Sequence, residues 1–307
     1  MSEVVSFLQL MLTSMVPFIL AAQGTALAGR SGVFVVSQEG YMTLGAALGF
    51  VVSWASGSNF LGLVAAAAAG IVLGLVMGVM TTQFKLDQFV VGLALLFLAM
   101  GLATLVYKVS VGVTLTPPLI DTLPRIKIPL ISDIPVIGPI LTQDLMVWFA
   151  LFIGLVIWWV LYKTNLGLKV RSVGENPKAS DSLGINVSRT RLICTALGCA
   201  LIVMAGAYLP MAFTGTYTEG IVGGRGWLVI ALAFFGGWRP TLIMGGAAFF
   251  AGLEVLALRA QVGGLGVPHQ FISMLPFVAT LFVMVFALRW VREPAFLGKN
   301  HDRESRH

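Results

Sequence analysis

The stretch that decides the fold is Phe60–Thr81, which reads FLGLVAAAAAGIVLGLVMGVMT. It contains no charged residue, and at about 1.5 Å per residue it is long enough to cross a hydrocarbon core of about 30 Å as a helix. Its apolar residues do not alternate with polar ones, so it is not a strand of a membrane barrel. Glycines recur every fourth residue in it, as they do at Gly45 and Gly49, and this spacing indicates close helix packing at Gly70, Gly74 and Gly78.

The whole chain has the composition of such a segment. Charged residues make up 10% of its 307 residues and apolar residues 58%, whereas a soluble domain carries about 25% charged residues. We therefore predict an all-α polytopic membrane protein that forms a single transmembrane domain, residues 1–307. Cys194 and Cys199 share one apolar run, which argues against a disulfide. The other predicted spans are Val4–Ala22, Tyr41–Ser56, Phe89–Tyr107, Leu145–Tyr162, Leu192–Phe213, Thr241–Leu258 and Phe271–Trp290.

Two apolar stretches are interrupted or short. Gly24–Val36 is broken by Gly29, Arg30 and Gly32, and Trp227–Gly237 is too short to span as a straight helix. Broken helices line the transport site of many transporters, although an ordinary turn between spans is an equal alternative. On this basis we predict that the substrate pathway runs past Ser37, Gln38, Glu39, Phe234, Phe235 and Trp238.

Basic residues set the expected orientation, because cytoplasmic loops are enriched in Lys and Arg. If Trp227–Gly237 is a crossing element, the chain crosses the membrane about nine times, with the N-terminus outside and the C-terminus in the cytoplasm. Val4–Ala22 lacks a preceding basic residue, so we expect it to be a retained helix and not a signal peptide. Only five basic residues then lie outside, namely Lys108, Arg125, Lys127, Arg225 and Arg259, and the inner side holds the other fourteen.

Two loops stand out between the spans. Residues 108–144 hold six prolines, which indicates a stiff external loop that is either a docking surface or a lid over the helix ends. Residues 163–191 form the cytoplasmic loop, in which Asn176 suits an N-cap, Pro177 the first helical position and Gly184 the residue after the helix. This pattern predicts a two-turn helix that inserts into a partner or lies on the membrane surface.

The sequence has no catalytic or phosphate-binding motif, so transport must be driven by a gradient or by a separate motor. The three histidines are too scattered for a metal site. Charged residues at membrane depth are the remaining candidates. We expect Glu39 to cap the helix that follows it, and Glu254 to reach the surface or to pair with Arg259. The aromatic Trp238 is expected either in an aromatic belt or stacked on a planar ligand.

The segment Gly174–Val187 resembles the coupling-helix region of ABC importer permeases of the branched-chain amino acid, ribose and nucleoside group. That family reads Gly-Glu-Asn-Pro, then small residues, then Gly-Ile. The similarity runs from about Met11 to Trp290, and its other matching motifs are Arg30–Val33 with Glu39-Gly40, Ser132–Pro139, Gly224–Trp227 and Gly236–Pro240.

The resemblance implies a type II ABC importer fold and a permease for nucleosides or related small polar solutes, closest to the smaller nucleoside permease. It implies a second, paralogous permease in a heterodimer, with a homodimer as the alternative. ATPase subunits would bind inside and consume the ATP, a substrate-binding protein would dock outside, and this chain would bind no cofactor. The implied ATPase-coupling residues are Gly174, Glu175, Asn176, Pro177, Lys178, Ala179, Leu183 and Gly184.

The sequence also departs from the family pattern. Val35-Val36-Ser37 stands where the nucleoside branch often has Asn-Ile-Gly, and Leu96 stands where an Asn is common. These two lost amides leave simple sugars or branched-chain amino acids as alternative substrates. An ion-coupled secondary transporter is the second hypothesis, with Glu39 or Glu254 as its coupling carboxylate.

Overall fold

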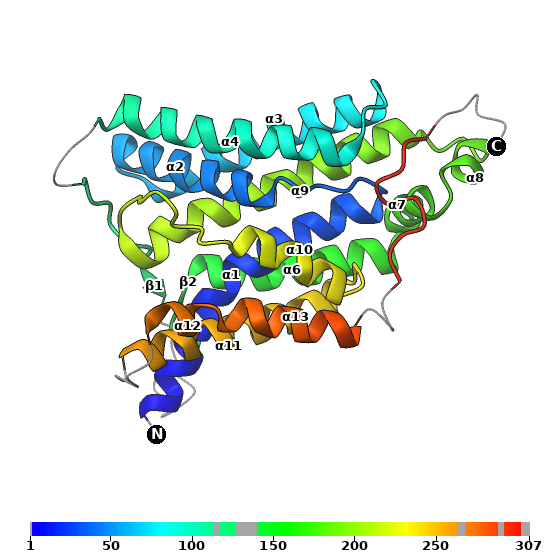
Figure 1. Ribbon diagram of the computed structural model, residues 1–307. Coiled ribbons are helices and arrows are strands. Elements are labelled where there is room, and N and C mark those ends of the chain that lie inside the picture. The colour runs from blue at the N-terminus through cyan, green and yellow to red at the C-terminus, as the bar shows by residue number, and fades with distance from the viewer. Residues whose placement is uncertain (1, 113–116, 127–139, 263–267, 288–291, 302–307) are drawn as a thin grey trace.

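The computed structural model describes residues 2–112, 117–126, 140–262, 268–287 and 292–301. The described chain is a bundle of helices that run side by side, and its two ends lie at opposite ends of the bundle (Figure 1). In the first half the helices are α1 (Ser2–Arg30), α2 (Gln38–Ser56), α3 (Asn59–Thr82) and α4 (Gln88–Ser110). The second half contains α6 (Leu145–Lys163), α7 (Asn165–Glu175), α8 (Pro177–Ser182), α9 (Val187–Leu209), the π-helical turn η1 (Pro210–Thr214), α10 (Arg225–Phe235), α11 (Pro240–Val262), α12 (His269–Ser273) and α13 (Leu275–Ala287).

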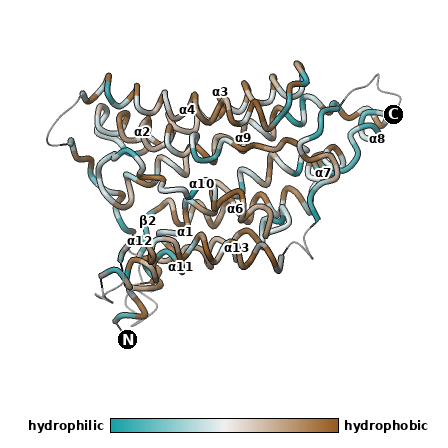
Figure 2. Tube along the Cα trace, viewed as in Figure 1, coloured by the Kyte–Doolittle hydropathy of each residue, from teal (hydrophilic) through white to brown (hydrophobic). Residues whose placement is uncertain are grey.

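Six helices among the described residues are long and apolar enough to cross a membrane: α1, α3, α4, α6, α9 continued by η1, and α11. Figure 2 shows hydrophobic residues along the lengths of these helices and hydrophilic residues near α8 at one end. The first and the last of the predicted spans need correction. The first helix does not end at Ala22 but continues to Arg30, and the last span, Phe271–Trp290, is divided at Met274 into α12 and α13. Its final residues lie outside the described ranges.

Helix α9 is the centre of the bundle, with α1, α2 and α3 packed around it. Its apolar window is 78% buried, against 50% or less for the other five candidate spans. Glycines make this packing close, as their spacing predicted. A Cβ at Gly70 would lie 2.6 Å from the Cα of Ala200, and one at Gly74 would lie 2.6 Å from the Cα of Ala196. Backbones in direct contact gain dispersion energy that a lipid tail cannot supply.

The described part of the predicted external loop packs onto the helix ends. The amide of Ile120 donates to the carbonyl of Gly215 at 2.8 Å, and that of Leu123 donates to Met211 at 3.0 Å. Strands β1 (Arg125–Ile126) and β2 (Gln143–Asp144) then pair antiparallel. This part therefore covers the helix ends as a lid does, whereas the predicted motif Ser132–Pro139 lies outside the described residues.

The C-terminal segment 294–301 folds back onto the opposite end of the bundle. The amide of Phe296 donates to the carbonyl of Gly174 at 3.0 Å. Asn300 donates from Nδ2 to the carbonyl of Lys85 at 2.6 Å. The guanidinium of Arg191, which is 1% exposed, donates to the carbonyls of Ser31 at 3.1 Å and Lys299 at 3.0 Å.

We expect Gly74→Ala to lower the melting temperature of the detergent-solubilised chain. The new Cβ would meet the backbone of α9, which cannot rotate away, and overpacking of this kind costs about 1–3 kcal/mol. Gly101→Ala in α4 is the matched control, because a Cβ there would have no atom within 4 Å. Equal melting temperatures for the two variants would contradict the close α3–α9 packing.

Candidate functional site

The candidate site is built where two helices begin inside the bundle. Residues 33–37 are not helical and lead into α2, and the turn-rich segment 215–224 leads into α10. Figure 1 shows both helices starting within the length of the bundle and not at its ends. A helix that starts in an apolar environment exposes N–H groups that water cannot satisfy. Each of these two starts therefore requires a hydrogen-bond acceptor from elsewhere in the chain.

Glu39 supplies that acceptor for α10. Its Oε1 accepts from the amide of Gly224 at 2.9 Å and its Oε2 accepts from the amide of Gly226 at 2.8 Å. Glu39 itself lies in the first turn of α2, so one carboxylate faces the positive ends of two helix dipoles. The approach is close, because a Cβ at Gly226 would lie 2.5 Å from the Cα of Glu39.

Among the described residues, the carboxylate of Glu39 accepts from the start of α10 and not from an amide of its own helix, so the predicted cap on α2 is corrected to a cap on α10. The predicted cap was on α2 alone. The caps to α10 join residues 185 and 187 positions apart, and no local pattern signals a pairing at that separation. Neither Ser37 before α2 nor Gly224 before α10 makes a side-chain cap of its own.

The other predicted pathway residues are placed differently. Ser37 and Gln38 are fully buried, and Gln38 donates from Nε2 to Thr25 Oγ1 at 3.2 Å and to the Val35 carbonyl at 2.7 Å. Phe234 and Phe235 are half-buried at the far end of α10. An eleven-residue helix is about 16 Å long. Glu39 and the pair Phe234–Phe235 therefore lie at opposite ends of α10, and Trp238 is not brought to Glu39.

Trp238 is fully buried, so its aromatic-belt interpretation is wrong. Its ring centroid lies 5.5 Å from that of Phe234 in an edge-on contact. Its ring fills the space beside Gly29, where a Cβ would be 3.0 Å from Trp238 Cη2 and closer to two other ring atoms. The backbone at Trp238 is left-handed, with φ of 57°, and this turn ends the α10 segment.

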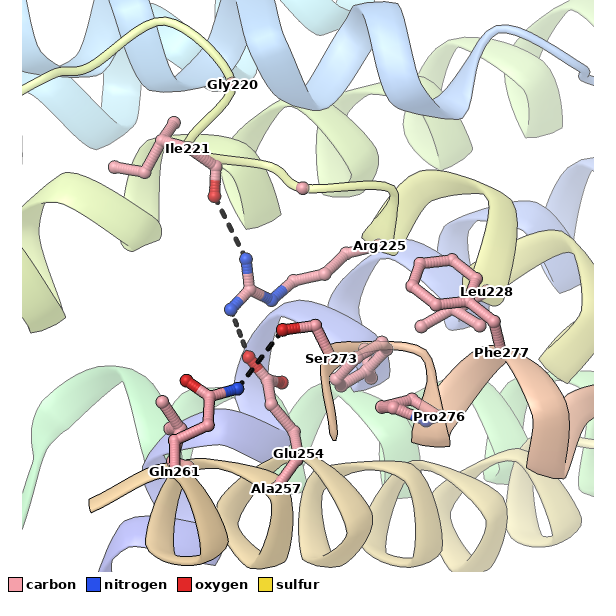
Figure 3. Close-up of a pocket in the computed structure, with 13 residues that line it drawn as sticks. Gly220, Ile221, Arg225, Leu228, Glu254, Ala257, Gln261, Ser273, Pro276 and Phe277 are labelled. Carbon is pink, nitrogen blue, oxygen red and sulfur yellow. Dashed lines mark hydrogen bonds and ion pairs between the residues drawn. The ribbon is translucent and has the colours of Figure 1, made fainter. Parts of the chain in front are cut away.

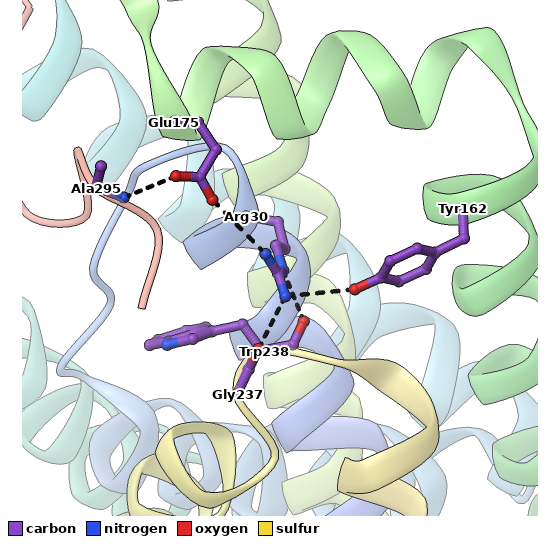
Figure 4. A network of polar contacts seen from close by, with 6 residues as sticks. All are labelled: Arg30, Tyr162, Glu175, Gly237, Trp238 and Ala295. Atoms are coloured by element: carbon purple, nitrogen blue, oxygen red, sulfur yellow. Dashed lines mark hydrogen bonds and ion pairs between the residues drawn. The ribbon is translucent and has the colours of Figure 1, made fainter. Parts of the chain in front are cut away.

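Arg30 binds the C-terminal end of α10 (Figure 4). Its guanidinium donates to the carbonyls of Trp238 and Gly237, each at 2.8 Å, and to the hydroxyl of Tyr162 at 3.3 Å. It also lies 4.0 Å from the carboxylate of Glu175. A cation at a helix C-terminus is favourable for the same dipole reason that an anion is at the N-terminus. Helix α10 is thus held by Glu39 at one end and by Arg30 at the other.

A cavity of about 350 Å³ lies beside the start of α10, between that helix, α11 and the α12–α13 turn (Figure 3). Arg225 crosses it and forms an ion pair with Glu254. Gln261 donates from Nε2 to Ser273 Oγ at 3.1 Å on its wall. The predicted partner of Glu254 needs correction, because Arg259 instead donates to the carbonyl of Glu3 at 2.8 Å.

The predicted two-turn helix is present as α8. The side chain of Asn176 accepts from the amide of Ala179 at 3.0 Å, Pro177 occupies the first turn, and Gly184 follows with φ of +80°. Leu183 at its end is 81% exposed. The sequence missed α7, an amphipathic helix that immediately precedes α8, because this stretch was interpreted as loop. The α9 helix also begins at Val187, earlier than the predicted Leu192.

Comparison with known proteins bears on what this arrangement does. Residues 7–288 match the model of the family described as "branched-chain amino acid transport system / permease component". The match spans nearly all of the described chain. The chain belongs to this family. It is therefore a permease component and a multi-pass membrane protein, in keeping with its six candidate spans.

Three relatives of this permease align over most of their length. The guanosine ABC transporter permease protein NupQ of Bacillus subtilis is 32% identical over 87% of this chain and 87% of its own. The putative glucose ABC transporter permease protein TsgC13 of Haloferax volcanii is 29% identical over 93% and 94%. The nucleoside ABC transporter permease protein NupC of Lactococcus lactis is 30% identical over 97% and 98%. No solved structure gave a significant match.

Removing the carboxylate that caps α10 should destabilise this permease. We expect Glu39→Ala to lower the melting temperature, because an unsatisfied buried N–H costs about 1–3 kcal/mol. Glu39→Gln keeps one acceptor oxygen, so its melting temperature should lie between those of wild type and Glu39→Ala. Glu219→Ala is the control, since the pair that Glu219 forms with Lys108 is exposed to solvent and contributes little. If Glu39→Ala melts like Glu219→Ala, the cap does not stabilise α10.

Proposed function

We propose that this permease is the transmembrane subunit of an ATP-driven importer for nucleosides or related small polar solutes. The observation that carries the proposal is the coupling segment: an N-capped two-turn helix with an exposed leucine at its end, in a chain of this permease family. Two of its relatives are named for guanosine and for nucleosides. ATP is consumed by separate ATPase subunits, and this chain holds no cofactor.

The coupling segment consists of Gly174, Glu175, Asn176, Pro177, Lys178, Ala179, Leu183 and Gly184. Pro177 and Ser180 pack α8 against the rest of the chain, whereas Ala179 and Leu183 face outward. In this proposal an ATPase groove receives Ala179 and Leu183. Movement of α8 then reaches α10 through Glu175 and Arg30. Glu175 is the last residue of α7, and Arg30 contacts both its carboxylate and the carbonyl of Trp238 after α10. Alternating access follows from a rigid-body shift between two states.

The partners and orientation follow from the same proposal. The chain crosses the cytoplasmic membrane nine times, with the segment before α2 and the segment before α10 each completing one crossing. The N-terminus lies outside and the C-terminus, with α8, lies in the cytoplasm, which agrees with the opposite positions of the two ends in Figure 1. A paralogous permease completes a heterodimer, and a substrate-binding protein docks at the outer end, on the side of β1 and β2.

The solute pathway in this proposal runs along α10. Glu39, Phe234 and Phe235 are partly exposed and can meet a solute directly. Ser37, Gln38 and Trp238 are fully buried, so they reach the solute only when α10 shifts. The departures from the nucleoside pattern lie together beside this path: Val36 packs on Gly92 and Leu96 on Gly40.

Sugar transport is the second candidate, favoured by the relative TsgC13, which is named as a putative glucose permease. A radiolabel competition assay with guanosine, uridine, glucose and leucine separates the candidates. Uptake inhibited by nucleosides alone supports the main proposal. An ion-coupled transporter would instead move solute in liposomes that contain neither ATPase nor ATP, and that result would overturn the ATP-driven mechanism.

The coupling role is tested by Leu183→Asp. We expect this variant to lose co-purification with the ATPase and at least tenfold of ATP-dependent uptake, because a charge would enter an apolar groove. Leu119→Asp is the matched control, since Leu119 is also largely exposed, at 73%, but lies on the external loop. Both variants should express and melt like wild type. Undiminished ATPase capture by Leu183→Asp would contradict the proposed docking.

A further inference from the structure

A second and larger hollow lies away from α10, between α6 and α9. This α6–α9 groove has a volume of about 590 Å³, with walls that include Ile153 and Ile157 of α6 and Leu197 and Leu201 of α9. Helix α7 packs against both α6 and α9 and closes the groove at one end. Leu197 is 50% exposed, so the groove opens on the outer surface of the bundle.

The lining of the α6–α9 groove matches hydrocarbon. Among the described residues that line it, Lys169 is the one charged residue and Thr190 the one hydroxyl. A nucleoside or a sugar would leave its own polar groups unpaired along such a wall, at a cost of about 1–3 kcal/mol each. An acyl chain has no such groups, and a groove that opens on a surface covered by bilayer meets acyl chains continuously.

Positive charge is concentrated at the α7 end of the groove. Lys169 and Arg171 both lie on α7. Lys163 is the last residue of α6, and Arg189 is in the first turn of α9. Glu175, also on α7, is engaged by Arg30. Basic pockets between membrane helices on the cytoplasmic side bind anionic lipid headgroups. The groove therefore combines a hydrocarbon slot with an anion-binding mouth.

We propose that the α6–α9 groove is a binding site for an anionic phospholipid, with one acyl chain against α6 and α9 and the phosphate beside Lys169. The lipid has a structural consequence. Leu166 and Val170 of α7 also line the groove, and α7 runs directly into α8. A bound lipid would pack against α7, the helix that leads into α8. Occupancy of the groove by lipid therefore sets how firmly α8 is held.

Lipid retention by the purified transporter complex tests this site. The complex is incubated in mild detergent with phosphatidylglycerol or phosphatidylcholine of identical acyl chains, and bound lipid is measured by native mass spectrometry. We expect wild type to retain phosphatidylglycerol about fivefold better, the factor that one basic residue near an anionic group supplies. Lys169→Glu should abolish that preference, and Leu197→Trp, which fills the slot, should reduce retention of both lipids.

Two matched controls test whether the effects are specific to the α6–α9 groove. Lys85→Glu reverses a charge at the same end of the bundle, and Leu98→Trp enlarges an equally exposed leucine of α4, 51% exposed; both should behave as wild type. Equal retention of the two lipids by wild type, or an unchanged preference in Lys169→Glu, would overturn the proposal. So would a cross-link from Leu197→Cys to a second permease, because protein would then fill the groove. None of these readouts depends on which solute is transported.

Discussion

An eleven-residue helix inside an apolar bundle cannot take its missing hydrogen-bond partners from water. Helix α10 is such an element, and the chain must supply an acceptor at its N-terminus and donors at its C-terminus. Glu39 and Arg30 meet these needs, and their charges match the direction of the helix dipole. The course of the non-helical segment before α2 follows from this constraint, because it must place both residues against one short helix.

The same two residues join α10 to different parts of the molecule. Glu39 lies in the first turn of α2, which packs on α9 and α4, so the N-terminal end of α10 is tied to the core. Arg30 contacts Tyr162 of α6 and Glu175 of α7, so the C-terminal end is tied to the segment that precedes α8. A short helix with one end on a rigid core and the other on a surface element is suited to respond to movement at that surface.

The local features of this fold could be predicted from sequence, and the long-range ones could not. Asn176, Pro177 and Gly184 act within a few residues of one another, so their pattern predicts α8 correctly. The end of α1 was missed because Gly29, Arg30 and Gly32 suggested a break, whereas the helix continues to Arg30 and Gln23 within it donates from Nε2 to the carbonyl of Pro240 at 2.9 Å. The pairing of Glu39 with α10 has no signal in a single sequence, because its partners are distant along the chain.

The buried guanidinium of Arg191 has a consequence for how the protein is made. One of its acceptors is the carbonyl of Lys299, 108 positions further along the chain, so the ribosome adds the donor well before this acceptor. During synthesis α9 therefore forms with that donor unsatisfied, and the donor is satisfied only when the later segment 294–301 folds back onto the bundle. A chain truncated before residue 294 would lack the carbonyl of Lys299, so a nitrogen of this buried guanidinium would lose its acceptor and α9 would keep a further unsatisfied donor.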